Sequence, residues 1–359
     1  MKWIRRFLVI MGLTIILAGA GIYAYLYSLT PKTSGQIALQ GLNQEVAVFF
    51  DQFGIPHIYG QNEEDVYLAL GYVHARDRLF QMEMMRRVPA GRLSEILGKD
   101  LLETDRFFRV LGINHWAERM AAKTFKETSA PYKKAILAYF AGVNQYIAEG
   151  KKPIEFRLIG IPMEPFAPRD VYLIGGLMAF GFAQGFTIDP VVTKAYDKLG
   201  WEYLKDWVLD WAPGAEMIPV HKAASSYTAA ADHLAPMVQR IMTHLPVAPW
   251  LGSNSWVLSP RKTASQKVIF ANNTHMAYGQ PSVWYEAHLE CPGFSFYGNH
   301  AAGLPFGIIG HNRHMAWGMT MFENDDVDFY RERVNPDNPD QVWVDDHWED
   351  LLIREEAVS

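Results

Sequence analysis

The sequence lacks the residues and motifs that build several common functional sites. Cys291 is the single cysteine among 359 residues, which excludes an internal disulfide framework and a cysteine-based zinc cluster. Positive charge is not in excess, since 33 basic residues face 39 acidic ones, and the net charge of −6 gives no indication of a nucleic-acid partner. The GxSxG, HExxH, Walker and GxGxxG motifs are also missing. The chemistry of this chain must therefore come from a different arrangement of residues.

The composition fits a folded globular protein. Hydrophobic residues make up 49% of the chain and charged residues 20%, which excludes a wholly disordered protein. The 11 Trp, 17 Tyr and 20 Phe residues supply enough aromatic volume for a sizeable core. The length suits one large domain or two of ordinary size.

The N-terminus has the pattern of an export segment. The first six residues carry three basic side chains and no acidic one, and residues 7–27 follow without a charge. Such a run is long enough to cross a bilayer as a helix, and the basic residues in front would stay in the cytoplasm. Residues 18–20 offer an alternative, a small-residue cleavage site. An inner-membrane anchor and a cleaved signal over 1–29 both predict that the rest of the chain is periplasmic or otherwise extracytoplasmic.

Helical patterns dominate the first part of the chain. Apolar residues recur at helical spacing from about Asn62 to Arg87. Pro89 is expected to end that helix, because a residue before proline is pushed out of helical geometry. Residues 131–148 and 169–186 are further candidates, and the second is apolar on all sides, which predicts a buried helix.

Strand patterns replace helical ones after residue 252. Residues 221–252 are rich in Ala and Ser and predict a weakly structured linker or surface segment. Short β-like runs separated by turn residues then predict an antiparallel sheet. These runs are 256–258, 268–271, 283–289, 294–296, 307–309 and 315–317.

Gly252 and Ser253 lie where the Ala/Ser-rich segment meets the first of these strands. If the peptide bond between them were cut, Ser253 would carry a free α-amine beside its own hydroxyl. An α-amine has an unperturbed pKa of roughly 7.7–8.0, so it can act as the general base that a serine nucleophile requires near neutral pH. From these two residues alone, a turn leading into a strand remains the simpler interpretation.

An ordered series of motifs favours the catalytic interpretation. Residues 253–258, SNSWVL, resemble the start of the catalytic subunit in the penicillin acylase family of N-terminal-nucleophile hydrolases. Further segments resemble the family in the same order, from about residue 40 to residue 333. They are DQFGIPHI (51–58), HARDRLFQMEMMRR (74–87), GRLSE (91–95), ANNTH (271–275), GHN (310–312), AWGMT (316–320) and DDVD (325–328). The series is specific for the family and much less so for the substrate.

The resemblance implies a fold and a maturation pathway. The fold is α+β, the four-layer αββα sandwich of these hydrolases, and the protein is an exported precursor that cuts itself and sheds a spacer. The family precursor is far longer, so we expect the β-subunit to be truncated at its C-terminus and the sandwich to be incomplete. The implied segments are an export signal or membrane anchor at 1–29, a mostly helical α-subunit region at 30–221, a spacer at 222–252 and the start of the β-subunit at 253–359.

The resemblance also assigns catalytic roles. Ser253 would be the nucleophile, with its own α-amine as the base. The tetrahedral oxyanion needs preorganised donors, and by position the backbone N–H of Met321 would be one of them. The family's second donor, an asparagine side chain, falls beyond residue 359. His275 stands where penicillin G acylases have glutamine and where cephalosporin and acyl-homoserine-lactone acylases tend to have histidine. It could hold the α-amine or the substrate through a hydrogen bond, or be merely structural.

A structural calcium ion and no organic cofactor are implied as well. Asp325, Asp328 and the carbonyl of Val327 match the family's calcium-binding stretch, and calcium prefers carboxylate and carbonyl oxygens. The family's glutamate ligand from the α chain falls near residues 187–189, where Asp189 is the nearest acid. The alternative for the acidic stretch is a loop that is simply solvated.

The family's acyl-pocket positions carry mostly flexible apolar side chains. Without the resemblance such a group would be read as core. Flexible methionines could wrap a linear acyl chain, and with one aromatic residue in the group the stacking on a phenylacetyl ring would be weak. We therefore expect an aliphatic acyl group to be preferred. The positions are Met178, Phe182, Met276, Ile309 and Met319.

These expectations describe an exported amidohydrolase that cleaves the N-acyl amide bond of a small molecule through an acyl-enzyme. Whether the substrate is of the β-lactam or the N-acyl-homoserine-lactone type is left open. The partners are the α and β chains of the same precursor and, through the N-terminal segment, a membrane. The alternative from another class is a non-catalytic truncated homologue or a membrane-anchored binding protein, which would leave the ordered motifs unexplained.

Overall fold

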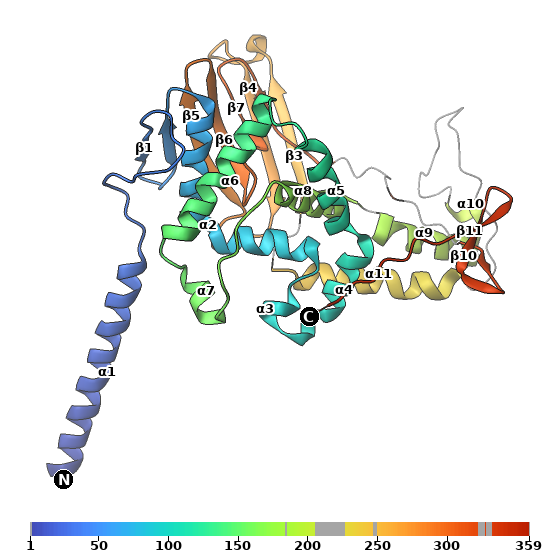
Figure 1. Cartoon of the computed structure of the whole chain (residues 1–359), viewed down its shortest axis with the longest axis horizontal. Coiled ribbons are helices and arrows are strands. Elements are labelled where there is room, and N and C mark those ends of the chain that lie inside the picture. The colour runs from blue at the N-terminus through green and yellow to red at the C-terminus, as the bar shows by residue number, and fades with distance from the viewer. Residues whose placement is uncertain are drawn as a thin grey trace. The chain divides into compact units, whose positions relative to one another are not determined.

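Figure 1 shows the computed structural model of the chain, which describes residues 2–183, 185–204, 227–246, 250–321, 327 and 332–358. Helices and sheets are both present, which confirms the α+β class at this coarse level. The chain divides into two compact units. Unit 1 comprises Met1–Arg86, Ala117–Tyr172 and Trp284–Trp317, and unit 2 comprises Arg87–Trp116, Leu173–Val283 and Gly318–Ser359.

Helices come mostly before the strands along the chain. The helices are α1 (Lys2–Leu29), α2 (Glu63–Ala90), α3 (Ser94–Leu97), α4 (Leu102–Leu111), α5 (Ile113–Thr124), α6 (Pro131–Glu149), α7 (Ile154–Ile159), α8 (Arg169–Phe182), α9 (Gly185–Leu199), α10 (Trp201–Leu204) and α11 (Tyr227–His244), with 3₁₀ turns at Lys99–Leu101 and Pro260–Lys262. The strands are β1 (Ala47–Phe50), β2 (Pro56–Tyr59), β3 (Trp250–Leu258), β4 (Ile269–Met276), β5 (Trp284–Cys291), β6 (Phe294–Ala301), β7 (Ile309–His311), β8 (Ala316–Trp317), β9 (Val334–Asn335), β10 (Asn338–Val344) and β11 (His347–Asp350).

The N-terminal helix α1 matches the expected export segment. None of its residues is buried. It contains an 18-residue window with a mean hydropathy of 2.2, so by length and composition it can cross a membrane. A signal sequence has the same properties, and both interpretations are consistent with export.

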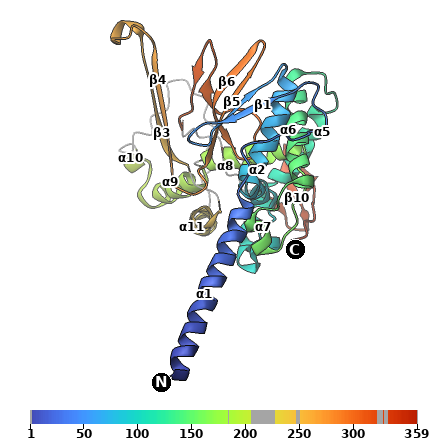
Figure 2. The same ribbon diagram turned by 90° about the vertical axis from the view of Figure 1, so that its left-hand side faces the viewer.

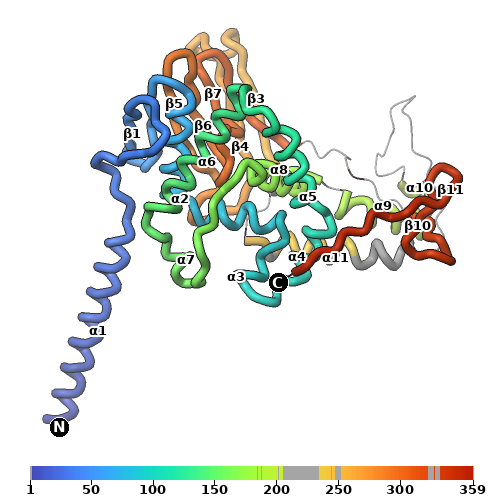
Figure 3. The backbone as a smooth tube through the Cα atoms, viewed as in Figure 1, coloured from blue at the N-terminus to red at the C-terminus, as the bar shows by residue number. Residues whose placement is uncertain are grey.

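Unit 1 is built around a six-stranded sheet with the order β1-β2-β5-β6-β7-β8. The tube in Figure 3 shows β1, from the start of the chain, in one sheet with β5 and β6. β2 and β5 pair in parallel, with His57 opposite His288, whereas the other neighbours are antiparallel. The prediction of one antiparallel sheet is therefore wrong. The sheet is mixed because it recruits N-terminal strands, and β3 and β4 form a separate pair.

One face of this sheet packs against helices α2 and α6, as Figures 1 and 2 show. Side chains along β5 alternate between buried and half-buried, as expected for a strand with one covered face. His74 of α2 stacks on Tyr285 of β5 with ring centroids 4.2 Å apart. The core of unit 1 therefore lies between the sheet and these two helices.

Two glycines let α2 and α6 touch backbone to backbone. A Cβ added at Gly71 would lie 1.9 Å from the carbonyl oxygen of Tyr139, and one at Gly142 would lie 1.9 Å from the carbonyl oxygen of Leu68. No side chain fits at either position without moving a helix.

Helix α2 does not stop before Pro89 as predicted. It continues through Pro89 and ends at Ala90, and the next residue, Gly91, has a positive φ of 62°. Val88 is fully buried and Ala90 nearly so. Packing of this last turn therefore outweighs the local preference of the residue before proline.

Helix α8 buries one side rather than its whole circumference. Leu173, Ile174, Leu177 and Met178 are buried, whereas Gly175 and Ala179 are exposed. The prediction of a helix buried all round is thus wrong, because glycine and alanine on the outer side read as apolar without needing burial. In unit 2, Phe180 of α8 packs against Phe107, Phe108 and Phe186 with ring centroids 5.4–5.6 Å apart.

Most of the described part of the predicted spacer is helical, and its last residues, 250–252, begin β3, which corrects the expectation of a weakly structured segment. Helix α11 covers Tyr227–His244 and packs against α9. Alanine is the strongest helix former, and the alanines at 229–231 lie in the first turns of α11. Residues 222–226 and 247–249 lie outside the described part of the chain, and the spacer boundaries stay a prediction.

Candidate active site around Ser253

Ser253 lies on β3, in a two-stranded antiparallel ribbon with β4 (Figure 2). The register places Ser253 opposite Thr274 and Gly252 opposite His275. β3 runs without interruption across the predicted cleavage site between Gly252 and Ser253. The Ser253 side chain is half-buried, so a substrate or a neighbouring group can reach its hydroxyl.

Gly252 has a backbone conformation that favours glycine. Its φ is +144°, and the β3–β4 register shifts between Trp250 and Gly252. A Cβ at Gly252 would also approach the Nδ1 of His275 to 3.3 Å. The residue in front of the predicted nucleophile is therefore held in an irregularity of the strand, of the kind that occurs next to active sites.

The backbone N–H of Met321 reaches the predicted nucleophile. It donates a hydrogen bond to the Ser253 Oγ, with an N–O distance of 2.7 Å. The two residues are 68 positions apart, and the structure brings them together within unit 2. A backbone N–H at the attacking oxygen also lies within reach of an oxyanion that forms on the carbon it attacks.

Asn272 is a contact residue of this site that sequence reasoning did not single out. It lies on β4, and its side chain bonds both to β3 and to the segment 318–321 that ends with Met321. Asparagine is depleted in strands, so two consecutive asparagines inside the β-like segment 269–276 were a signal that could have identified it.

His275 lies at the same end of the ribbon as Ser253. Its Nε2 is 3.2 Å from the Nδ2 of Asn254, the residue after the predicted nucleophile. An amide nitrogen donates, so the imidazole Nε2 is the acceptor in this contact. In this uncut chain His275 therefore faces Gly252 and Asn254, one on each side of Ser253.

The predicted acyl-pocket residues lie in different places. Met178 is buried on α8, whereas Phe182, at the end of α8, and Met276, at the end of β4, are half-buried. Met319 is 38% exposed in the segment beside Asn272. Ile309 lies on β7 in unit 1, while the other four belong to unit 2. The pocket itself stays a prediction.

The predicted calcium ligands are only partly described. Asp325 and Asp328 lie outside the described residues. Val327 packs its carbonyl oxygen against the start of α9, where a Cβ added at Gly185 would lie 2.5 Å from it. Asp189 lies in the next turn of the same helix. A carbonyl and a carboxylate are the kinds of oxygen donor that calcium prefers, and the calcium site stays a prediction. Among the described residues, no three His, Cys, Asp or Glu side chains are placed to hold a metal.

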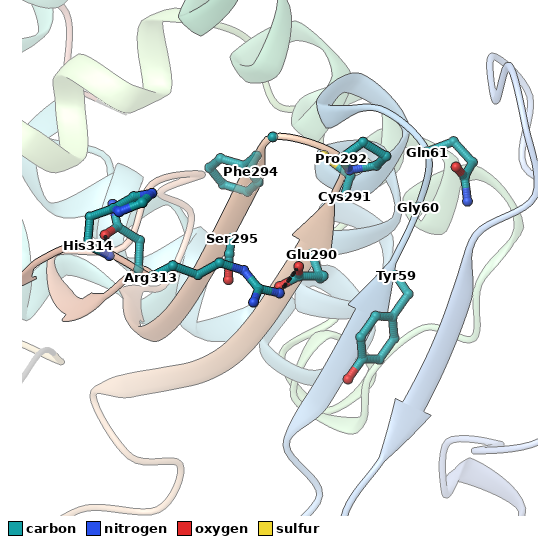
Figure 4. Close-up of a pocket in the computed structure, with 12 residues that line it drawn as sticks. Tyr59, Gly60, Gln61, Glu290, Cys291, Pro292, Phe294, Ser295, Arg313 and His314 are labelled. Carbon is teal, nitrogen blue, oxygen red and sulfur yellow. Dashed lines mark hydrogen bonds and ion pairs between the residues drawn. The ribbon is translucent and has the colours of Figure 1, made fainter.

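A separate pocket of about 530 Å³ opens on unit 1 at one end of its sheet (Figure 4). Arg313 and Glu290 form an ion pair in it, and the turn at residues 292–293 closes one side. Its lining comes from 59–61, 290–295 and 312–314, and includes none of the predicted catalytic or acyl-pocket residues. We therefore place the candidate chemistry at Ser253 and not in this pocket.

Unit 1 also buries two histidines away from Ser253. His74 accepts or donates a 2.9 Å hydrogen bond at Nδ1 with the Tyr139 hydroxyl, and its ring centroid lies 6.3 Å from that of His300. Burial lowers the pKa of His300 to about 4. Burial, together with the neighbouring His300 and Arg78, holds the pKa of His74 well below its usual value. Both histidines are therefore neutral in the fold at physiological pH.

The comparison with known protein families agrees with the interpretation drawn from the geometry of the site. The family model described as penicillin amidase matches residues 45–359. The chain therefore belongs to the penicillin amidase family, as the motif series predicted.

Curated relatives include two kinds of acylase. The chain is 31% identical over 336 residues to the acyl-homoserine lactone acylase QuiP of Pseudomonas aeruginosa and 33% identical over 316 residues to the penicillin acylase 2 proenzyme of Pseudomonas sp. (strain SE83). It is 29% identical over 374 residues to the penicillin G acylase of Escherichia coli. These alignments cover 91%, 86% and 88% of this chain but 39%, 40% and 43% of the relatives, so the chain spans about 40% of their length.

A solved structure is also similar. The thermostable penicillin G acylase from Alcaligenes faecalis, in a tetragonal form, is 23% identical with a TM-score of 0.38, over 50% of this chain and 100% of that one.

Proposed function

We propose that this chain is an exported amidohydrolase that cuts itself between Gly252 and Ser253 and then hydrolyses N-acyl amides of small molecules at Ser253. The observation that carries the proposal is the 2.7 Å hydrogen bond from the Met321 N–H to the Ser253 Oγ. Membership of the penicillin amidase family supports it, as do relatives named acylases of penicillin and of acyl-homoserine lactones.

Self-cutting uses the same hydroxyl as later turnover. The Ser253 Oγ attacks the carbonyl carbon of Gly252, its proton passes to the Ser253 nitrogen, and the C–N bond breaks to leave an ester. Water then hydrolyses that ester, which releases the Gly252 carboxylate and restores the hydroxyl beside a new α-amine. His275 lies opposite Gly252 in the ribbon, which supports a role beside the bond that breaks.

Turnover follows the same logic on an external amide. The α-amine takes the hydroxyl proton as the Oγ attacks the acyl carbon, and the Met321 N–H stabilises the oxyanion. The departing amine receives that proton, and water then attacks the acyl-enzyme to release the acid. This chemistry requires no organic cofactor.

The remaining features of the proposal concern assembly and place. Residues 30–221 and 253–359 would remain together as α and β chains after the spacer 222–252 leaves, within the αββα sandwich of the family. A calcium ion held by Asp189, Val327, Asp325 and Asp328 would cross-link segments of the chain. Helix α1 would direct the protein to the periplasm, as a signal or as an anchor.

Covalent trapping tests the proposed role of Ser253. The purified chain is incubated with a chromogenic straight-chain N-acyl amide, quenched in acid and digested, and the peptide that begins at Ser253 is examined by mass spectrometry. We expect that peptide to gain the acyl mass and Ser253→Ala to release no chromophore. Hydrolysis that persists in Ser253→Ala would overturn the proposal.

The acyl preference is tested separately. The pocket positions are mainly methionines, so the rate for straight-chain acyl amides should exceed the rate for the phenylacetyl amide of the same amine. A strong preference for the phenylacetyl substrate would contradict the aliphatic pocket while leaving the role of Ser253 intact.

A further inference from the structure

The side chain of Asn272 connects three backbone segments around the candidate nucleophile. Its Nδ2 donates to the carbonyl oxygen of Asn254 on β3 at 3.2 Å and to the carbonyl oxygen of Met319 at 2.9 Å. Its Oδ1 accepts the N–H of Met319 at 3.2 Å. Both donor hydrogens and one acceptor position of the amide are therefore in use.

We infer that Asn272 is a positioning residue that holds the segment 318–321 against the β3–β4 ribbon, so that the Met321 N–H lies at the Ser253 Oγ. Residues 318–321 belong to no strand, so no ladder of backbone hydrogen bonds fixes them there. Two of the three bonds of Asn272 go to Met319, two residues before Met321. The effect of Asn272 on the reaction rests on the proposed role of Ser253. The position of the segment 318–321 against the ribbon does not depend on that role.

The chemistry of this link requires an amide. Aspartate keeps an acceptor for the Met319 N–H but has no donor, so it would place a carboxylate against the carbonyl oxygens of Asn254 and Met319. That arrangement leaves two carbonyls unpaired and adds electrostatic repulsion. Asn272→Asp therefore changes the link while keeping the size and shape of the side chain.

Gly318 is the second residue that keeps the segment 318–321 in contact with Asn272. A Cβ added there would lie 2.6 Å from both the Cγ and the Oδ1 of Asn272. Gly318→Ala should therefore push the segment away from Asn272 without altering Asn272 itself. Asn272→Asp and Gly318→Ala therefore disturb the same contact, one by changing the side chain and the other by changing the backbone segment that it binds.

Asn273 supplies the matched control. It is the next residue on β4, and its side chain is exposed. Asn273→Asp makes the same chemical change one position along the strand, where the side chain points to the other face of the ribbon. Any general effect of a new carboxylate on β4 appears in both variants.

Amide hydrogen exchange tests the arrangement independently of catalysis. In a Ser253→Ala background the chain has no nucleophile, and the Met319 N–H still bonds to Asn272. Exchange is followed by mass spectrometry on peptides that cover 318–321. We expect Asn272→Asp and Gly318→Ala to exchange the Met319 amide at least tenfold faster, and Asn273→Asp to leave it unchanged. Equal exchange in all variants would overturn the inference.

The rate of self-cutting tests the consequence for the reaction. The rate of self-cutting is measured in full chains that carry Ser253. The temperature is kept well below the melting temperature of each variant, where a modest loss of stability leaves the folded fraction unchanged. We expect Asn272→Asp and Gly318→Ala to cut at least tenfold more slowly than Asn273→Asp. Faster exchange with an unchanged rate would contradict a positioning role. A parent chain that does not cut itself would instead contradict the proposed function. The hydrogen-exchange result would still test whether Asn272 holds the segment 318–321.

Discussion

At the residue scale, the N–H of Met321 is the group that distinguishes Ser253 from an ordinary serine in a strand. Its identity as methionine does not matter for this contact, because the donor belongs to the backbone. The position could be predicted from the resemblance to the family, but no local pattern links two residues 68 positions apart. Asn272 could have been noticed as one of two consecutive asparagines in a β-like segment, but its contacts with Asn254 and Met319 could not be predicted from local sequence.

Replacing Met321 with proline removes this donor. Because loss of one oxyanion donor typically costs about 10²–10³ in rate, Met321→Pro should slow self-cutting by roughly that factor. Met321→Leu keeps the N–H and should cut within a few-fold of the parent rate. The rates come from the time course of intact masses, and equal rates in the proline and leucine variants would exclude a role for this N–H.

His300 makes stability depend on pH in a defined direction. Burial lowers its pKa in the fold to about 4 from a usual value of 6.5. Between these values the unfolded chain binds a proton that the folded chain excludes, so the free energy of unfolding falls as the pH drops through this window. For this residue alone the loss between pH 7 and pH 4.5 is roughly 2–3 kcal/mol. Urea unfolding at the two pH values measures it.

The matched variants for this prediction are His300→Phe and His314→Phe. The first removes the buried titrating group and should reduce the loss of stability on acidification. The second changes an exposed histidine and should leave that loss unchanged. The same pH dependence in His300→Phe and the parent would show that another group is responsible.

At the scale of single elements, helix α6 was predictable and its neighbours were less so. The pattern predicted 131–148 and the helix covers Pro131–Glu149, because proline suits the first position of a helix and the apolar period is regular. The end of α2 and the separation of β3 and β4 as a two-stranded ribbon of their own depend on packing instead. A proline in the last turn of α2 is tolerated because the turn is buried, which no property of the local sequence reveals.

Substitution of Gly142 by alanine tests whether packing or helix propensity dominates at this position. The two predict changes of opposite sign in the free energy of unfolding. Propensity alone makes Gly142→Ala stabilising by about 1 kcal/mol in a helix interior. A Cβ placed 1.9 Å from the Leu68 carbonyl oxygen must instead separate α2 from α6. We expect the free energy of unfolding to fall by about 3 kcal/mol, because overpacking against a rigid backbone is costly.

Denaturant unfolding decides between the two signs. The control is Ala141→Gly, an exposed neighbour on the same helix, which should cost about 0.5–1 kcal/mol from propensity alone. A Gly142→Ala variant more stable than the parent would refute the close crossing of α2 and α6.

At the scale of the whole molecule, the α+β class and the family could be predicted, and the sheet pairing could not. β2 and β5 pair in parallel with His57 opposite His288, 231 residues later in the chain. Strand patterns show where strands are and say nothing of such distant partners. The helix in the predicted spacer was missed because its alanines were read as flexible, although alanine favours helices.

Calcium removal tests the proposed cross-link. If Asp189 and Val327 hold the ion, a chelator should lower the melting temperature of the parent by several degrees, since a ligand at 100 times its Kd stabilises by about 2.7 kcal/mol. Asp189→Asn should show a smaller shift. Asp197→Asn, an exposed position on the same helix α9, should respond like the parent. If the chelator leaves the melting temperature of the parent unchanged, the result would argue against the proposed calcium site.

The most direct measurement of the central claim is the intact mass and N-terminal sequence of the purified full-length chain, beside Ser253→Ala prepared in the same way. We predict that the parent yields a fragment that begins at Ser253 and that Ser253→Ala stays joined across Gly252 and residue 253. A parent that remains uncut, or a cut at this bond that persists without the serine hydroxyl, would contradict the role of Ser253 as a self-activating nucleophile.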